Sequence, residues 1–158
     1  MENVKGNPPK QKAVKHIPEG LHTVTPFLIV NEAEKFIEFV KKAFNAELTF
    51  VWKGDDQKIV HATVKIGDSI IMLSDAMDEF KPMPSMLQLY VEDVDAQYNQ
   101  ALKAGGQSLR EPSDQFYGDR SSGIKDSWGN QWWISTHIED VSEEEMRHRE
   151  EEFRKEKV

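Results

Sequence analysis

The sequence predicts an α+β domain made of two copies of one module, in which a strand and a helix are followed by three strands. Strand-like and amphipathic helical patterns occur twice in this order, and the second copy begins sixty-one residues after the first. Asn45 and Gly106 end the two predicted helices at equivalent positions, and both residue types suit a left-handed helix end. We therefore expect two small mixed sheets with helices on one face.

Module one spans residues 21–75 and begins with an apolar strand. The helix that follows carries its apolar residues on one face: Ala33, Phe36, Ile37, Val40 and Phe44. The pair Gly67-Asp68 separates two apolar runs and predicts a tight hairpin. The predicted elements are, in order, strand Val24–Val30, helix Asn31–Phe44 and strands Glu47–Trp52, Ile59–Ile66 and Ser69–Ser74.

Module two spans residues 85–138 and repeats the scheme. Gly105-Gly106 ends its helix, and Trp128-Gly129-Asn130 takes the part of the hairpin turn. The predicted elements are, in order, strand Met86–Val91, helix Asp93–Ala104 and strands Gln107–Arg110, Arg120–Lys125 and Gln131–Thr136.

The two ends of the chain differ in composition from the domain at residues 21–141. Residues 1–20 are basic, contain prolines and carry few apolar side chains, which predicts a flexible tail. Residues 142–158 predict a charged helix, because Ser142 precedes Glu145 by three residues and pairs such as Glu145 and Arg149 are spaced i, i+4. One hypothesis is that this helix contacts a partner protein, although most such helices are simply solvated.

Composition excludes several classes of function. The sequence has no cysteine, which rules out disulfides, thiolate metal sites and cysteine nucleophiles. A formal net charge of -8 disfavours nucleic acid as a partner. No apolar stretch reaches the length needed to span a membrane and no export signal is visible, so we expect a cytoplasmic protein without a membrane partner.

The strand at residues 59–66 alternates in character. Val60, Ala62, Val64 and Ile66 form one side, which predicts contact with the helices, and His61 lies on the other side. If the sheets are curved, His61 faces a concave, ligand-binding surface. The alternative is that this side is solvated and His61 is an ordinary surface residue.

Several motifs occur in order at the spacing of a known family: Thr25–Val30, Ile59–Ala62, Ile66–Asp75, Gln115–Arg120 and Asp126–Asn130. They resemble the PhnB-like branch of the vicinal oxygen chelate superfamily, which contains glyoxalases, bleomycin-resistance proteins and dioxygenases. The resemblance implies two βαβββ modules forming cupped mixed sheets, and usually a homodimer. It does not define one reaction, because the superfamily includes isomerases, dioxygenases, epimerases, thiol transferases and drug-sequestering proteins.

The resemblance also implies four positions for metal ligands. These positions carry Thr25, Met72, Met86 and Trp133, none of which is a usual ligand for a divalent transition metal. We therefore expect no metal and no cofactor. An apolar, aromatic and polarisable lining favours a flat or hydrophobic ligand.

We expect a small-molecule pocket with the following lining: Thr25, Phe27, Trp52, His61, Met72, Met86, Gln88, Tyr90, Arg120 and Trp133. Each aromatic or methionine also fits plain core packing. Arg120 is either a clamp for a ligand carboxylate or phosphate, or the partner of Asp119 in a turn.

The predicted function is metal-independent binding or sequestration of a hydrophobic or aromatic compound. The alternative is an enzyme of the lyase, isomerase or dioxygenase type with His61 as acid or base, so the sequence leaves open whether the protein is an enzyme.

Overall fold

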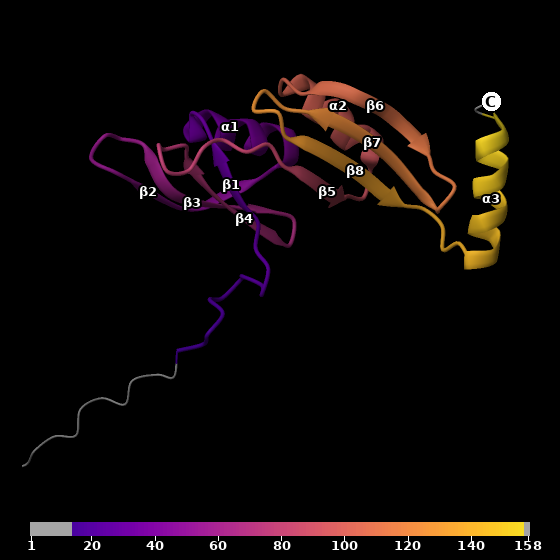
Figure 1. Ribbon diagram of the computed structural model, residues 1–158, viewed down its shortest axis with the longest axis horizontal. Coiled ribbons are helices and arrows are strands. Elements are labelled where there is room, and N and C mark those ends of the chain that lie inside the picture. Colours follow the sequence, from indigo (N-terminus) through magenta and orange to yellow (C-terminus); the bar gives the residue numbers. More distant parts are fainter. Residues whose placement is uncertain (1–13, 157–158) are drawn as a thin grey trace, which may run out of the picture.

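The computed structural model describes residues 14–156 and has the predicted two-module α+β architecture. The elements are, in order, β1 (Phe27–Val30), α1 (Ala33–Phe44), β2 (Glu47–Lys53), β3 (Ile59–Ile66), β4 (Ser69–Asp75), β5 (Met86–Tyr90), α2 (Val94–Lys103), β6 (Gln107–Asp114), β7 (Asp119–Lys125), β8 (Gln131–His137) and α3 (Glu143–Glu156). The modules lie side by side along the long axis of the molecule, with α3 beyond the far end of module two (Figure 1). Residues 1–13 of the predicted tail lie outside the described residues.

Each module forms one four-stranded mixed sheet, and the strand order is the same in both. Sheet A has the order β1-β4-β3-β2, and sheet B has the order β5-β8-β7-β6. The first strand of each sheet runs parallel to the last strand of its module, and the other pairs are antiparallel. Phe27 pairs with Met72 in sheet A, and Gln88 pairs with Trp133 at the equivalent place in sheet B. The sequence repeat is therefore also a repeat of strand register.

A side chain on the last strand of each module holds the first turn of that module's helix. Asp75 Oδ1 accepts a hydrogen bond of 2.8 Å from the backbone N–H of Ala33, and Thr136 Oγ1 accepts one of 2.9 Å from that of Val94. These bonds satisfy N–H groups that a helix start leaves without partners. They also fix each helix against its sheet.

An aromatic cluster joins the two modules into one core. Phe44 of α1 lies 4.5 Å from Trp132 of β8, and Phe36 meets Trp128 edge-on at 5.2 Å, both between ring centroids. The Trp128 indole N–H donates to the backbone carbonyl of Asn31 over 2.6 Å. Trp132 is fully buried, as its place between sheet B and the helices requires.

The start of β3 departs from the predicted alternation. Ile59 is 2% exposed and Val60 is 41% exposed, so the prediction that Val60 packs on the helices is wrong. The register shifts between Trp52 and Lys53, where the partner position moves from His61 to Ile59. Such a bulge leaves Val60 unpaired and reverses side-chain parity at this point. Ala62 and Val64, beyond the bulge, are buried as expected.

Helix α3 covers the region where the capping spacing predicts a helix. Ser142 Oγ accepts a 3.2 Å hydrogen bond from the backbone N–H of Glu145. Arg149 binds both carboxylate oxygens of Glu139, and Phe153 lies 5.9 Å from Phe116 between ring centroids. Among residues 14–156, no helix combines the length and hydropathy needed to cross a membrane.

Candidate functional site

Each sheet presents one surface to its helix and a second surface on the opposite side. The second surface of sheet A, here called face A, consists of Phe27, Phe50, Trp52, His61, Thr63 and Met72. The corresponding surface of sheet B, here called face B, consists of Met86, Gln88, Tyr90, Arg110, Asp119, Ser121, Trp133, Ser135 and His137. These assignments follow from strand pairing, because directly paired residues share a face.

Face A is an aromatic surface around one imidazole. The His61 ring centroid lies 5.7 Å from that of Phe27 and 5.9 Å from that of Phe50. Phe27, Phe50 and Trp52 are 46%, 51% and 64% exposed, so large apolar groups face outward here. Thr63 Oγ1 lies 3.5 Å from His61 Nε2. Face A brings together four of the predicted lining residues: Phe27, Trp52, His61 and Met72.

Face B is a hydrogen-bonded polar surface. Asp119 is buried, accepts a 2.9 Å hydrogen bond from the Tyr90 hydroxyl, and lies 2.8 Å from Nδ1 of His137. His137 Nε2 lies 3.0 Å from Asp140. Asp140 and Asp119 raise the pKa of His137, because both carboxylates favour the imidazolium. The hydrogen bond to Asp119 raises the pKa of Tyr90.

Several of these polar residues have no place in the predicted lining. Ser135 is buried and accepts a 2.9 Å hydrogen bond from the Gln88 amide. Asp119, Ser135 and His137 share the parity of Trp133 and its neighbours on β7 and β8, and that alternation is the one sequence signal that points to them.

Trp133 lies on face B, and its neighbour Trp132 is buried on the helix side. The indole packs against the backbone of Gly123, where a Cβ would lie only 2.9 Å from Cζ3 of the ring. The guanidinium carbon of Arg110 lies over the indole, 4.7 Å from the ring centroid. Arg110 Nη2 donates to Ser121 Oγ over 2.9 Å. Glycine at 123 therefore allows a close stack of backbone, indole and guanidinium.

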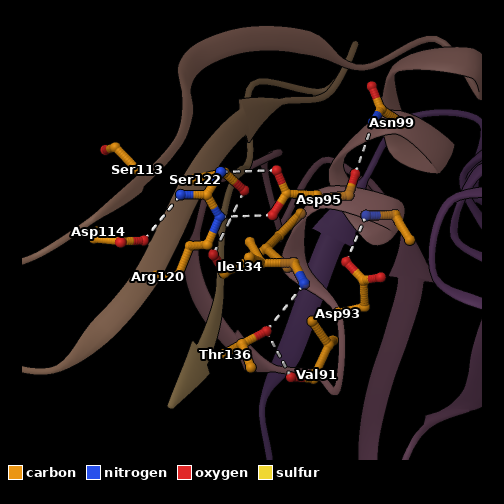
Figure 2. A network of polar contacts seen from close by, with 12 residues as sticks. Val91, Asp93, Asp95, Asn99, Ser113, Asp114, Arg120, Ser122, Ile134 and Thr136 are labelled. Carbon is orange, nitrogen blue, oxygen red and sulfur yellow. Dashed lines mark hydrogen bonds and ion pairs between the residues drawn. The ribbon is translucent and has the colours of Figure 1, made fainter. Parts of the chain in front are cut away.

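Arg120 lies on the helix side of sheet B, away from face B. Its Nε and Nη2 donate to the two carboxylate oxygens of Asp95 over 2.6 and 2.9 Å, and its Nη1 donates to Asp114 over 2.9 Å (Figure 2). Asp119 is thus not the partner of Arg120, because adjacent strand residues point to opposite faces. The guanidinium ties α2 to β7 and β6 and does not face the ligand surface expected from the sequence.

A cavity of about 1350 Å³ lies between the modules. Its walls include the chain before β1, the β3–β4 hairpin, and the end of β5 with the first turns of α2. Thr25, Gln88 and Tyr90 line it, and the other predicted lining residues do not. Met86 stands at the exposed start of β5. Within the described chain, the predicted lining is therefore divided between face A, face B and this cavity, and Arg120 lies at none of the three.

Comparison with known proteins decides the family. Residues 20–134 match the family described as the Glyoxalase/Bleomycin resistance protein/Dioxygenase superfamily. The chain belongs to this superfamily. Among relatives of this glyoxalase-superfamily chain, the uncharacterized protein Mb0911c of Mycobacterium bovis is 31% identical in an alignment of 135 positions that covers 78% of this chain and 89% of the relative.

Solved structures share the glyoxalase-superfamily fold at low sequence identity. TioX from Micromonospora sp. ML1 has a TM-score of 0.63 and 18% identity, over 73% of this chain and 99% of TioX. A Bacillus cereus structure described as putative 3-demethylubiquinone-9 3-methyltransferase, PhnB protein, has a TM-score of 0.56 and 19% identity, over 73% and 99% of the two chains.

The metal positions expected in this glyoxalase-superfamily chain do not carry a suitable set of donors. Thr25, Met72, Met86 and Trp133 supply a hydroxyl, two thioethers and an indole, whereas divalent transition metals prefer imidazole and carboxylate. Within residues 14–156, no three His, Cys, Asp or Glu side chains are grouped so that they could hold a metal ion. The residues present therefore do not fit the metal that other members use.

Proposed function

We propose that this chain binds, and by binding sequesters, a small flat hydrophobic or aromatic compound without a metal ion. The observation that carries this proposal is face A, where exposed Phe27, Phe50 and Trp52 surround a single imidazole. Aromatic rings with one polar partner suit stacking on a flat ligand and one orienting hydrogen bond. The donor set at the metal positions supports chemistry that does not depend on an ion.

The proposed binding unit is a homodimer. Face A is open in a single chain, so a bound compound would keep one side in water. A two-fold pair that brings face A of one copy near face B of the other would enclose it. The ordered motifs, together with the likeness to the Bacillus cereus PhnB structure, support a place in the PhnB-like branch.

Equilibrium binding of a neutral flat probe, 2-naphthamide, tests this proposal. Trp52→Ala is expected to weaken binding by about one to two decades, the effect of losing a large apolar contact of roughly 1–3 kcal/mol. Trp133→Ala is also expected to weaken binding if face B of the partner copy closes the ligand site on face A. Val51→Ala is the matched control, because Val51 pairs with Ala62 and points to the other side of β2. Absence of binding, or equal loss in the control, would overturn the proposal.

A second candidate is an enzyme with His61 as general acid or base. The observation in its favour is the position of His61, which is the imidazole of face A and lies beside aromatic rings that would hold a substrate. His61→Ala separates the two candidates. An orienting residue loses affinity modestly, whereas a catalytic base loses turnover by a factor on the order of 10² to 10⁴.

A further inference from the structure

Arg110 differs from the other arginines of the described chain in having no carboxylate partner. The ion pairs of the others are Arg120 with Asp95 and Asp114, Arg147 with Glu143, Arg149 with Glu139 and Glu145, and Arg154 with Glu150. The polar contact of the Arg110 side chain within residues 14–156 is the single hydrogen bond to Ser121 Oγ. Its positive charge is therefore not neutralised by a described side chain.

The guanidinium of Arg110 is nevertheless held in place. Arg110 pairs with Gly123 across β6 and β7, and its side chain crosses face B above the Trp133 indole. Its Nε is buried and has no hydrogen-bond acceptor. A buried donor without an acceptor is unfavourable and is rare in folded proteins. The stack thus presents an oriented cation whose donors outnumber the acceptors that the chain supplies.

The other polar groups of face B are already engaged with one another. Asp119, two residues from Ser121 on β7, accepts hydrogen bonds on both oxygens, from Tyr90 and His137. The Gln88 amide donates to Ser135. Asp119, the carboxylate of face B, is therefore not available to Arg110, and the guanidinium donors that remain accessible can bind an acceptor from another molecule.

We propose that Arg110, supported by Trp133 and Ser121, recognises the carboxylate of a planar aromatic ligand. This inference rests on the proposed function and narrows it from flat compounds in general to flat anions. A guanidinium is planar, donates two parallel hydrogen bonds to a carboxylate and stacks on aromatic faces. The carboxylate lies beside Arg110, and the ring system extends toward the aromatic side chains of face A in the partner copy.

The test compares two flat probes of nearly the same shape, anionic 2-naphthoate and neutral 2-naphthamide, by titration calorimetry at low salt. The wild-type protein is expected to prefer naphthoate by roughly tenfold, the size of one charge-assisted contact. Arg110→Gln is expected to abolish this preference, because it removes the charge that distinguishes the two probes. Arg120→Gln removes an arginine from the opposite side of sheet B and is expected to keep the preference. Arg110→Lys is expected to retain only part of it.

The possible outcomes separate the two proposals. Equal binding of both probes by the wild-type protein overturns the role of Arg110 and leaves the proposed function standing. Binding of neither probe at millimolar concentration overturns both. A preference that survives in Arg110→Gln, whose fold is verified by circular dichroism, places charge recognition elsewhere. Loss of dimer in Arg110→Gln with an unchanged preference makes Arg110 an interface residue and also overturns the inference.

Discussion

Gly123 controls how closely the Trp133 indole approaches sheet B. Because this glycine has no side chain, the indole can lie directly on the strand backbone, under the guanidinium of Arg110. The absence of a side chain at one position of β7 therefore determines where a charged group of β6 can lie. A binding surface built from such a stack tolerates little change in side-chain volume.

Gly123→Ala is expected to destabilise the protein by about 1–3 kcal/mol, because the new methyl group overlaps the indole and forces Trp133 out of its place. Urea denaturation measures this loss. The double variant Gly123→Ala/Trp133→Ala is the control, since removal of the indole removes the overlap. If Gly123→Ala costs as much without the indole as with it, the stack is not the cause.

His137 is expected to titrate above the ordinary histidine value near 6.5, because Asp140 and Asp119 stabilise its protonated form and raise its pKa. The contribution of protonated His137 to the unfolding free energy is present in full below the pKa that this histidine has in the unfolded chain. It is lost as pH rises through the pKa of His137 in the folded protein. His137→Gln should therefore lower the unfolding free energy more at pH 5.5 than at pH 8.5. Proton NMR of the imidazole gives the midpoint, and Asp140→Asn should lower it. A midpoint at or below 6.5 would contradict the assigned contacts.

The arrangement of helix α2 against sheet B depends on one arginine. Arg120 reaches from β7 to Asp95 in the first turn of α2 and to Asp114 at the end of β6, so three elements meet at its guanidinium (Figure 2). Bidentate geometry gives such a contact more directional strength than a single exposed ion pair has. The pKa of Asp95 is lowered by the same hydrogen bonds.

Arg120→Gln is expected to lower the urea midpoint more than Arg154→Gln does, because Arg154 makes one exposed pair within α3. The contribution of ionised Asp95 to the unfolding free energy is present above the ordinary carboxyl pKa near 3.9, and it is lost as pH falls through the lowered folded-state pKa. The difference in urea midpoint between the wild-type protein and Arg120→Gln should therefore become smaller at acidic pH. Equal effects of the two substitutions at pH 7 would show that the Arg120 network adds nothing beyond a surface pair.

Local signals in the sequence were sufficient to predict most helices and strands, but not to predict which residues share the candidate site. The helix end at Asn45, where φ is 55°, could be predicted from the residue type. At the end of α2 the prediction was one residue off, because the positive φ of 111° falls on Gly105 and not on Gly106. The bulge at Val60 could not be predicted, because it arises from the register between β2 and β3. The contact of Asp119 with His137 likewise depends on the pairing of β7 with β8.

At the scale of the whole molecule, the two modules carry surfaces of different chemistry. Face A is aromatic and exposed, and face B is polar with an unpaired guanidinium. Both modules contribute rings to the aromatic cluster between α1 and sheet B, which makes the modules one unit and leaves faces A and B on the sides away from the helices. Exposed aromatic patches of this kind mark contact surfaces in soluble proteins.

The proposed homodimer should sediment at twice the chain mass of 18.2 kDa at micromolar concentration. Stable interfaces bury about 1,200–2,000 Å² of surface, and the exposed aromatic side chains of face A would supply the apolar part of this area. Trp52→Glu is expected to weaken the dimer by at least about tenfold, because it places a charge in the apolar part of the interface. Val51→Glu puts the same charge one residue away on the other side of β2 and should leave the dimer intact. Sedimentation velocity over a dilution series measures both variants. A monomeric wild-type protein, or equal weakening by the two substitutions, would rule out face A as the dimer surface, and the flat ligand would then have to bind to a single chain.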